Sequence, residues 1–208
     1  MVSAQEALEL LKKGNNRYVS GRRFRSVLSM GRRRRRTRFD QSPFAIILGC
    51  SDSRVPPEMI FDKSLGDLFV VRVAGNVAGI SQIGTIEFAV QRLGARLIIV
   101  LGHTECGAVR AAFDEVEHPS EHLSPGLSSI IGAIRPLVEV LSDSDRRPDN
   151  RESVESVVRA NIRAVTAQLQ RESQILDAFM QEEGLEVIGA EYSLETGVVD
   201  FFEDREAE

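Results

Sequence analysis

Two cysteines, the only ones in the chain, stand in polar segments that follow apolar runs. Cys50 comes just after the apolar residues 44–48, and His103 and Cys106 follow the apolar residues 97–101. Thiolates and imidazoles are ligands that zinc takes in a tetrahedral site, and a catalytic site keeps the fourth position for water. We therefore interpret Cys50, His103 and Cys106 as the protein ligands of a catalytic zinc ion.

Two other interpretations of these cysteines exist. A buried cysteine is usually a small, inert hydrophobic side chain, and a cysteine paired with a histidine can instead be a nucleophile. The metal interpretation is favoured because both thiols occupy equivalent places after strand-like runs. His103 and Cys106 are also three positions apart, so a single turn can direct both toward one ion.

Asp52 and Arg54 follow the first cysteine closely. An aspartate near zinc would bind the ion unless another group held its carboxylate, and a guanidinium can hold a carboxylate through two hydrogen bonds. An ordinary structural Asp–Arg pair is the alternative. The position of this pair beside Cys50 favours a catalytic role, in which Asp52 accepts a hydrogen bond and Arg54 fixes its orientation.

Strand-like and helix-like segments alternate from residue 44 onward. The apolar patterns predict strands at 44–48, 68–73, 96–101, 185–190 and 197–202, with helices between most of them. This alternation predicts an α/β fold with a mostly parallel central β-sheet flanked by helices. Sites in such sheets form at the carboxyl ends of the strands, where Cys50 and His103 are expected to lie.

The first residues predict a helix. Ser3 and Glu6 have the spacing of a capping box at a helix start. We expect this helix to end, or to be broken, at the glycine and two asparagines of residues 14–16.

Composition narrows the class of protein. The chain has 208 residues, of which 42% are hydrophobic and 27% charged, and its net charge is −5. We expect a single domain, with residues 1–43 as an N-terminal helical arm with an arginine-rich segment and residues 44–208 as the α/β core. The negative charge argues against a nucleic-acid partner, and no apolar run approaches the ~20 residues needed to cross a membrane. Scarce cysteine and the lack of a signal peptide at the N-terminus predict a cytoplasmic protein.

Five consecutive arginines at positions 32–36 depart from this composition. Such a run can be a patch for an anionic partner. No aromatic side chains for stacking are interleaved with it. We therefore expect a surface segment that takes no part in the chemistry.

The motifs Cys50-x-Asp52-x-Arg54 and His103-x-x-Cys106-Gly107 closely resemble the zinc signature of the β-class carbonic anhydrases. Similar flanking segments lie at 66–72, 74–76, 86–90 and 189–197, so the likeness covers roughly residues 5 to 202. The resemblance implies zinc-dependent, reversible hydration of carbon dioxide to bicarbonate and a proton. Zinc would lower the pKa of its water toward ~7, and Asp52 would orient the resulting nucleophile.

The resemblance also implies a substrate pocket and an assembly. The matching pocket positions are Gln41, Phe69, Ala74, Phe88 and Gly107. Phe88 stands where relatives have a tyrosine. Members of the class form homodimers or dimers of dimers, with N-terminal helices that wrap the partner.

Some members of the class close their site when the aspartate leaves the arginine and becomes the fourth zinc ligand. Bicarbonate in a second pocket, built from a tryptophan, an arginine and a tyrosine, can drive this change. Arg72 and Tyr192 match two of these positions, but Ile47 replaces the tryptophan and the chain contains no Trp. We therefore predict an open site near neutral pH, with Asp52 on Arg54, and no control by bicarbonate.

Two alternative functions keep the zinc site. Relatives of this class hydrolyse carbonyl sulfide or carbon disulfide, and the ligand set does not distinguish these substrates from carbon dioxide. The other alternative is a zinc protein without catalysis that binds an anionic partner through its basic run. The intact pair of Asp52 and Arg54 argues against the second alternative.

Overall fold

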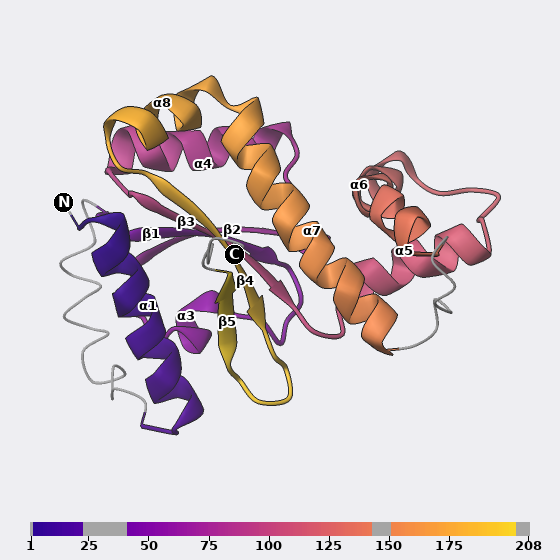
Figure 1. Ribbon diagram of the computed structural model, residues 1–208, viewed down its shortest axis with the longest axis horizontal. Coiled ribbons are helices and arrows are strands. Elements are labelled where there is room, and N and C mark those ends of the chain that lie inside the picture. The colour runs from indigo at the N-terminus through magenta and orange to yellow at the C-terminus, as the bar shows by residue number, and fades with distance from the viewer. Residues whose placement is uncertain (1, 23–40, 143–150, 203–208) are drawn as a thin grey trace, which may run out of the picture.

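The computed structural model describes residues 2–22, 41–142 and 151–202 (Figure 1). The arginines at 32–36 lie outside these residues, as does the charged connection at 143–150. Its helices are α1 (Ala4–Val19), α3 (Pro57–Ile60), η2 (Ala74–Asn76), α4 (Ile80–Leu93), α5 (Gly107–Glu117), α6 (Pro125–Ser142), α7 (Arg151–Glu172) and α8 (Gln174–Glu182). Its strands are β1 (Ala45–Cys50), β2 (Leu68–Val73), β3 (Leu97–His103), β4 (Glu186–Tyr192) and β5 (Val199–Phe202).

The five strands form one sheet in the order β2-β1-β3-β4-β5. The first four are parallel to their neighbours, and β5 pairs with β4 in the antiparallel sense. This confirms the α/β fold with a mostly parallel sheet. Because β1 and β3 are neighbours, their carboxyl ends meet at one edge of the sheet.

Helices cover both faces of the sheet. In Figure 1, α4, α7 and α8 lie on one face and α1 and α3 on the other, while α5 and α6 stand beside the end of α7. Successive residues of β1 point to opposite faces, so Ile46 packs in the core under α4 and α7, whereas Ile47 packs in the core under α1. Burial on both faces explains why β1 and β3 are continuous apolar runs in the sequence.

The start of α1 is as predicted, but its end is not. Ser3 and Glu6 form both hydrogen bonds of a capping box. The helix then continues through residues 14–16 to Val19, which corrects the expected end or break. Gly14 lies directly against the main chain of Phe61, where a β-carbon would be 1.9 Å from the Phe61 carbonyl oxygen.

Asn15 gives the second reason why α1 continues. It is buried, and its amide nitrogen donates to the carbonyl oxygens of Ile60 (3.2 Å) and Gly197 (2.9 Å). Its amide oxygen accepts from the Val199 N–H at 2.9 Å. The residues that looked like a helix end are therefore the ones that fasten α1 to the start of β5.

None of the helices in the described ranges is long and apolar enough to span a membrane.

After β2 the chain makes the tight turn expected at residues 74–76, where Gly75 has a φ of 67°. Left-handed backbone of this kind favours glycine. The turn brings the Gly75 N–H beside the last residue of β1.

Candidate metal centre

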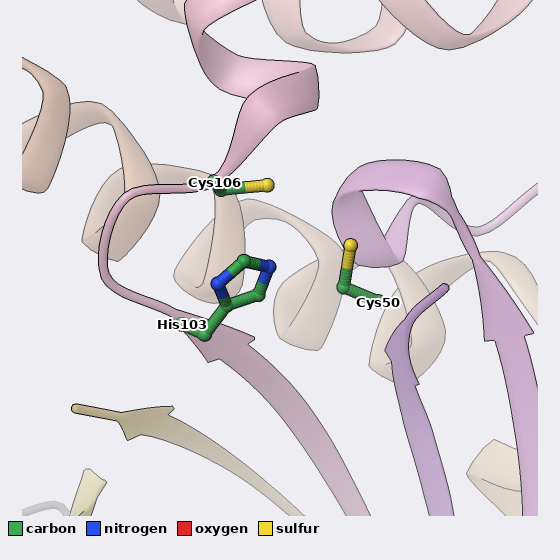
Figure 2. Close-up of side chains that lie close together, drawn as sticks. All are labelled: Cys50, His103 and Cys106. Atoms are coloured by element: carbon green, nitrogen blue, oxygen red, sulfur yellow. The ribbon is translucent and has the colours of Figure 1, made fainter. Parts of the chain in front are cut away.

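Cys50, His103 and Cys106 come together at the carboxyl edge of the sheet. Cys50 is the last residue of β1, His103 is the last residue of β3, and Cys106 directly precedes α5. Their ligand atoms all lie within 4.8 Å of one another, and all three side chains are buried. Figure 2 shows the Cys106 sulfur and the imidazole ring of His103 both extending toward the Cys50 side chain. The arrangement is that of a metal site assembled from two strand ends and a helix start.

The imidazole of His103 presents one nitrogen to this cluster. Its Nδ1 lies 2.8 Å from the Thr104 carbonyl oxygen, so Nδ1 carries the proton and donates it there. The Nε2 atom is buried and has no hydrogen-bond partner among the described residues. An unpartnered, buried imidazole nitrogen beside two sulfur atoms completes a set of ligand atoms that fits a zinc ion.

The pKa values of the two thiols are shifted in opposite directions. The hydrogen bond from the Cys106 thiol lowers the pKa of Cys50 to about 4, and the same interaction raises the pKa of Cys106. The Gly75 N–H also donates to the Cys50 sulfur at 3.4 Å. Because the thiolate is the form that binds metals, Cys50 is prepared for coordination before any ion arrives.

Asp52 lies beside the cluster and is held by Arg54. The guanidinium donates through Nε to Oδ1 at 3.0 Å and through Nη2 to Oδ2 at 2.7 Å, and the Arg54 main-chain N–H donates to Oδ1 at 2.9 Å. These bonds lower the pKa of Asp52 to about 2. The carboxylate therefore stays ionised, and its Oδ2 is 4.0 Å from Nε2 of His103.

Contacts that the sequence did not reveal hold the segment around Cys50. The Arg72 guanidinium donates to the carbonyl oxygen of Cys50 at 2.9 Å and to that of Asp52 at 2.6 Å. By sequence, Arg72 matches only a regulatory pocket that is incomplete here, and the structure adds that Arg72 holds the main chain around Cys50. Arg54 Nη2 also donates to the Glu105 carbonyl oxygen at 3.3 Å. Only the position of Glu105 between two ligands could have drawn attention to it.

The predicted pocket residues fall into two groups. Ala74 follows Val73, the register partner of Cys50, and Gly107 follows Cys106, so both adjoin the metal cluster. A β-carbon on Gly107 would meet no atom within 4 Å, so its surroundings are open.

The other three pocket residues lie away from the cluster of their own chain. Phe69 pairs with Ile46, four positions before Cys50 in β1. At ~3.3 Å per residue this places Phe69 about 13 Å along the sheet from the metal edge. The Phe88 ring lies 6.5 Å from the Phe69 ring and is half exposed, and Gln41 is exposed before β1 begins.

Comparisons with known proteins agree with this fold and site. The family profile described as "Carbonic anhydrase" matches residues 45–199. The chain is 37% identical to Carbonic anhydrase 2 of Mycobacterium tuberculosis over 193 residues, which cover 92% of this chain and 89% of that protein. It is also 37% identical to the carbonic anhydrase of Mycolicibacterium smegmatis over 199 residues, with coverages of 93% and 91%.

Solved structures give the same result. The β-carbonic anhydrase CafA of Aspergillus fumigatus superimposes with a TM-score of 0.75 at 27% identity, over 88% of this chain and 86% of that one. The β-carbonic anhydrase CcaA superimposes with a TM-score of 0.72 at 26% identity, over 96% and 87%. Fold and site thus define an α/β enzyme with a cluster of three candidate metal ligands at its sheet edge. The chain belongs to the carbonic anhydrase family, in its β class, and is a carbonate dehydratase by family.

Proposed function

We propose that the protein catalyses the reversible hydration of carbon dioxide to bicarbonate and a proton with zinc as its metal. The observation that carries this proposal is the buried group of Cys50, His103 and Cys106 beside a carboxylate that Arg54 holds. A purely structural zinc site has four protein ligands. Here three ligand side chains converge, and Asp52, the nearest further donor, is held by Arg54.

Each neighbouring residue has a distinct part in the proposed reaction. Bound zinc supplies the acidity that makes the attacking water a nucleophile near neutral pH. The ionised Asp52 carboxylate only accepts hydrogen bonds, so it would accept one from the nucleophile and thereby orient the nucleophile toward the substrate. Arg54 keeps that carboxylate in place, and the open surroundings of Gly107 leave room for a small linear molecule.

We further propose that the protein works as a homodimer or a dimer of dimers. Phe69 is about 13 Å along the sheet from the cluster of its own chain, and the Phe88 ring lies 6.5 Å from the Phe69 ring. Together they could line a pocket only at the site of a second subunit. Two apolar side chains of α4 are exposed, Ile80 at 93% and Phe88 at 50%, and they support an interface on this helix. A structural neighbour from Sordaria macrospora, 25% identical, is described as tetrameric.

Zinc content and stopped-flow hydration of carbon dioxide, measured on one preparation, test the proposed function. We expect one zinc per chain and hydration that rises across about pH 7 to 9. Asp52→Asn should keep the zinc and lose most of the activity. Asp114→Asn, the same change at an exposed position of α5, is the matched control. A zinc-loaded wild type without hydration activity would refute the proposal, and sulfide release from carbonyl sulfide by the same preparation would then favour the alternative substrate.

A further inference from the structure

Glu105, between the ligands His103 and Cys106, has an unusual main-chain conformation. Its φ is 56°, in the left-handed region that residues other than glycine, asparagine and aspartate rarely adopt. Something in the surrounding structure must therefore hold this conformation.

The left-handed conformation directs the Glu105 carbonyl oxygen to Arg54. Nη2 of Arg54 donates to this oxygen at 3.3 Å and to Asp52 Oδ2 at 2.7 Å. Arg54 therefore joins the segment that follows β1 to the segment that follows β3. If the carbonyl turned away, Arg54 would keep only its bonds to Asp52, and the whole side chain would be freer to move.

The side chain of Glu105 is fastened to the helix that Cys106 begins. Its carboxylate forms an ion pair with Nη2 of Arg110, whose own N–H donates to the Cys106 carbonyl oxygen in the first turn of α5. The pair thus bridges the left-handed residue and the rigid helix beside it. Both side chains are partly exposed, 31% for Glu105 and 53% for Arg110, so the pair is screened by water and its effect is modest.

We propose that Glu105 is a positioning residue of the metal site. Its ion pair with Arg110 holds the left-handed main chain, whose carbonyl oxygen keeps Arg54 on Asp52 and so keeps Asp52 away from the metal. The inference rests on the proposed function, because it assigns Glu105 a role in leaving the fourth metal position to water and substrate.

Binding of thiocyanate to the cobalt(II)-substituted protein, followed by visible absorption, tests the proposal without an activity assay. Arg110→Met should weaken the affinity of the fourth position for thiocyanate, because released Asp52 competes for it. The expected loss is about twofold to fivefold, the size of effect that a partly exposed ion pair supports. Glu105→Gln breaks the same pair from its other side and should give the same loss.

A double variant separates positioning from a general loss of stability. In Arg110→Met/Glu105→Gly, glycine adopts the left-handed conformation without the ion pair, so thiocyanate affinity should return to the wild-type value. Arg135→Met, which breaks the exposed pair with Glu139 on α6, is the control and should change nothing. Wild-type affinity in both single variants, or failure of the glycine variant to restore it, would overturn the proposal. If the wild type binds thiocyanate but does not hydrate carbon dioxide, the proposed function fails and this comparison still stands.

Discussion

The two segments that carry the metal ligands are held in different ways. The segment after β3 starts with neutral bonds to the β4 end of the sheet, since the Thr104 N–H donates to the Tyr192 carbonyl and the Leu194 N–H donates to Thr104 Oγ1, each at 3.0 Å. Its next residue, Glu105, is held by the ion pair with Arg110. The segment after β1 keeps one neutral bond, from Ser51 to Val73 at 3.2 Å, and then depends on the guanidinium groups of Arg54 and Arg72.

This difference indicates which part of the site can rearrange. Main-chain bonds at the end of a sheet break only when the sheet itself opens, whereas a partly exposed side chain changes its rotamer readily. The segment that begins at His103 is therefore the more rigid half of the candidate metal site. Asp52 lies in the half whose geometry is set by charge, and in the proposed function its orientation decides what reaches the metal.

Loss of a proposed ligand should have the largest effect on zinc affinity, and the loss should be equally large for the segments after β1 and after β3. Cys50→Ser and Cys106→Ser each remove a thiolate and should lower zinc affinity by more than ~100-fold, beyond the range for residues that only support ligands. Zinc content after dialysis against a chelator, together with hydration activity, measures this. Ser51→Ala, beside a ligand, is the control. A serine variant that retained stoichiometric zinc would remove that cysteine from the site.

Arg72→Met should lower zinc affinity through the segment after β1 alone. It removes two charge-assisted hydrogen bonds to the carbonyl oxygens of Cys50 and Asp52. We expect zinc affinity to fall by about 10-fold to 100-fold, as for other groups that orient metal ligands. Competition with a chromophoric chelator gives the affinity. Arg92→Met, at an exposed position of α4, should match the wild type, and an equal loss in both variants would point to net charge instead.

Arg54→Met should make the metal-free protein less stable in a way that depends on pH. The folded-state pKa of Asp52 is about 2, below its unfolded value of about 3.9. The stability that Arg54 confers through Asp52 is therefore complete above about pH 4 and is lost as the pH falls toward 2. Urea unfolding of the metal-free wild type and variant at a series of pH values measures the difference. A difference that stayed constant down to pH 2 would contradict the role given to Asp52.

Thr104→Val should have the smallest effect, and the effect should not depend on pH. The substitution leaves the Leu194 N–H without its acceptor at 3.0 Å, which costs ~1 kcal/mol of unfolding free energy. Both groups are neutral, so the cost should be the same at pH 3 and pH 7. Urea unfolding of the metal-free protein at these two values tests this. A cost that varied with pH would show that the bonds of Thr104 also depend on charge.

Features that depend on neighbours in the sequence could be predicted. The apolar runs predicted the buried strands, and the parallel arrangement predicted that the ends of β1 and β3 would meet, which placed Cys50 and His103 together. The capping box of Ser3 and Glu6 is likewise a contact between residues three apart. Such patterns arise from periodicity and short-range hydrogen bonds, which the order of residues carries by itself.

Features that depend on distant contacts became visible only in the tertiary structure. Gly14 and Asn15 resemble a helix end, yet α1 continues through both. The main chain of Phe61 lies where a β-carbon on Gly14 would be, and the buried amide of Asn15 accepts a hydrogen bond from β5. The left-handed conformation of Glu105 has no local signal either, since a glutamate does not favour it.

The sequence alone therefore determined the family, the fold class and the three side chains that cluster as candidate metal ligands. The tertiary structure decided how that site is held: which guanidinium grips which carbonyl oxygen, and that Arg54 joins two segments 51 residues apart in the chain. The physical reason is that ligand identity is written in residue type and local spacing, whereas the orientation of each ligand depends on hydrogen bonds from strands and loops that only folding brings near.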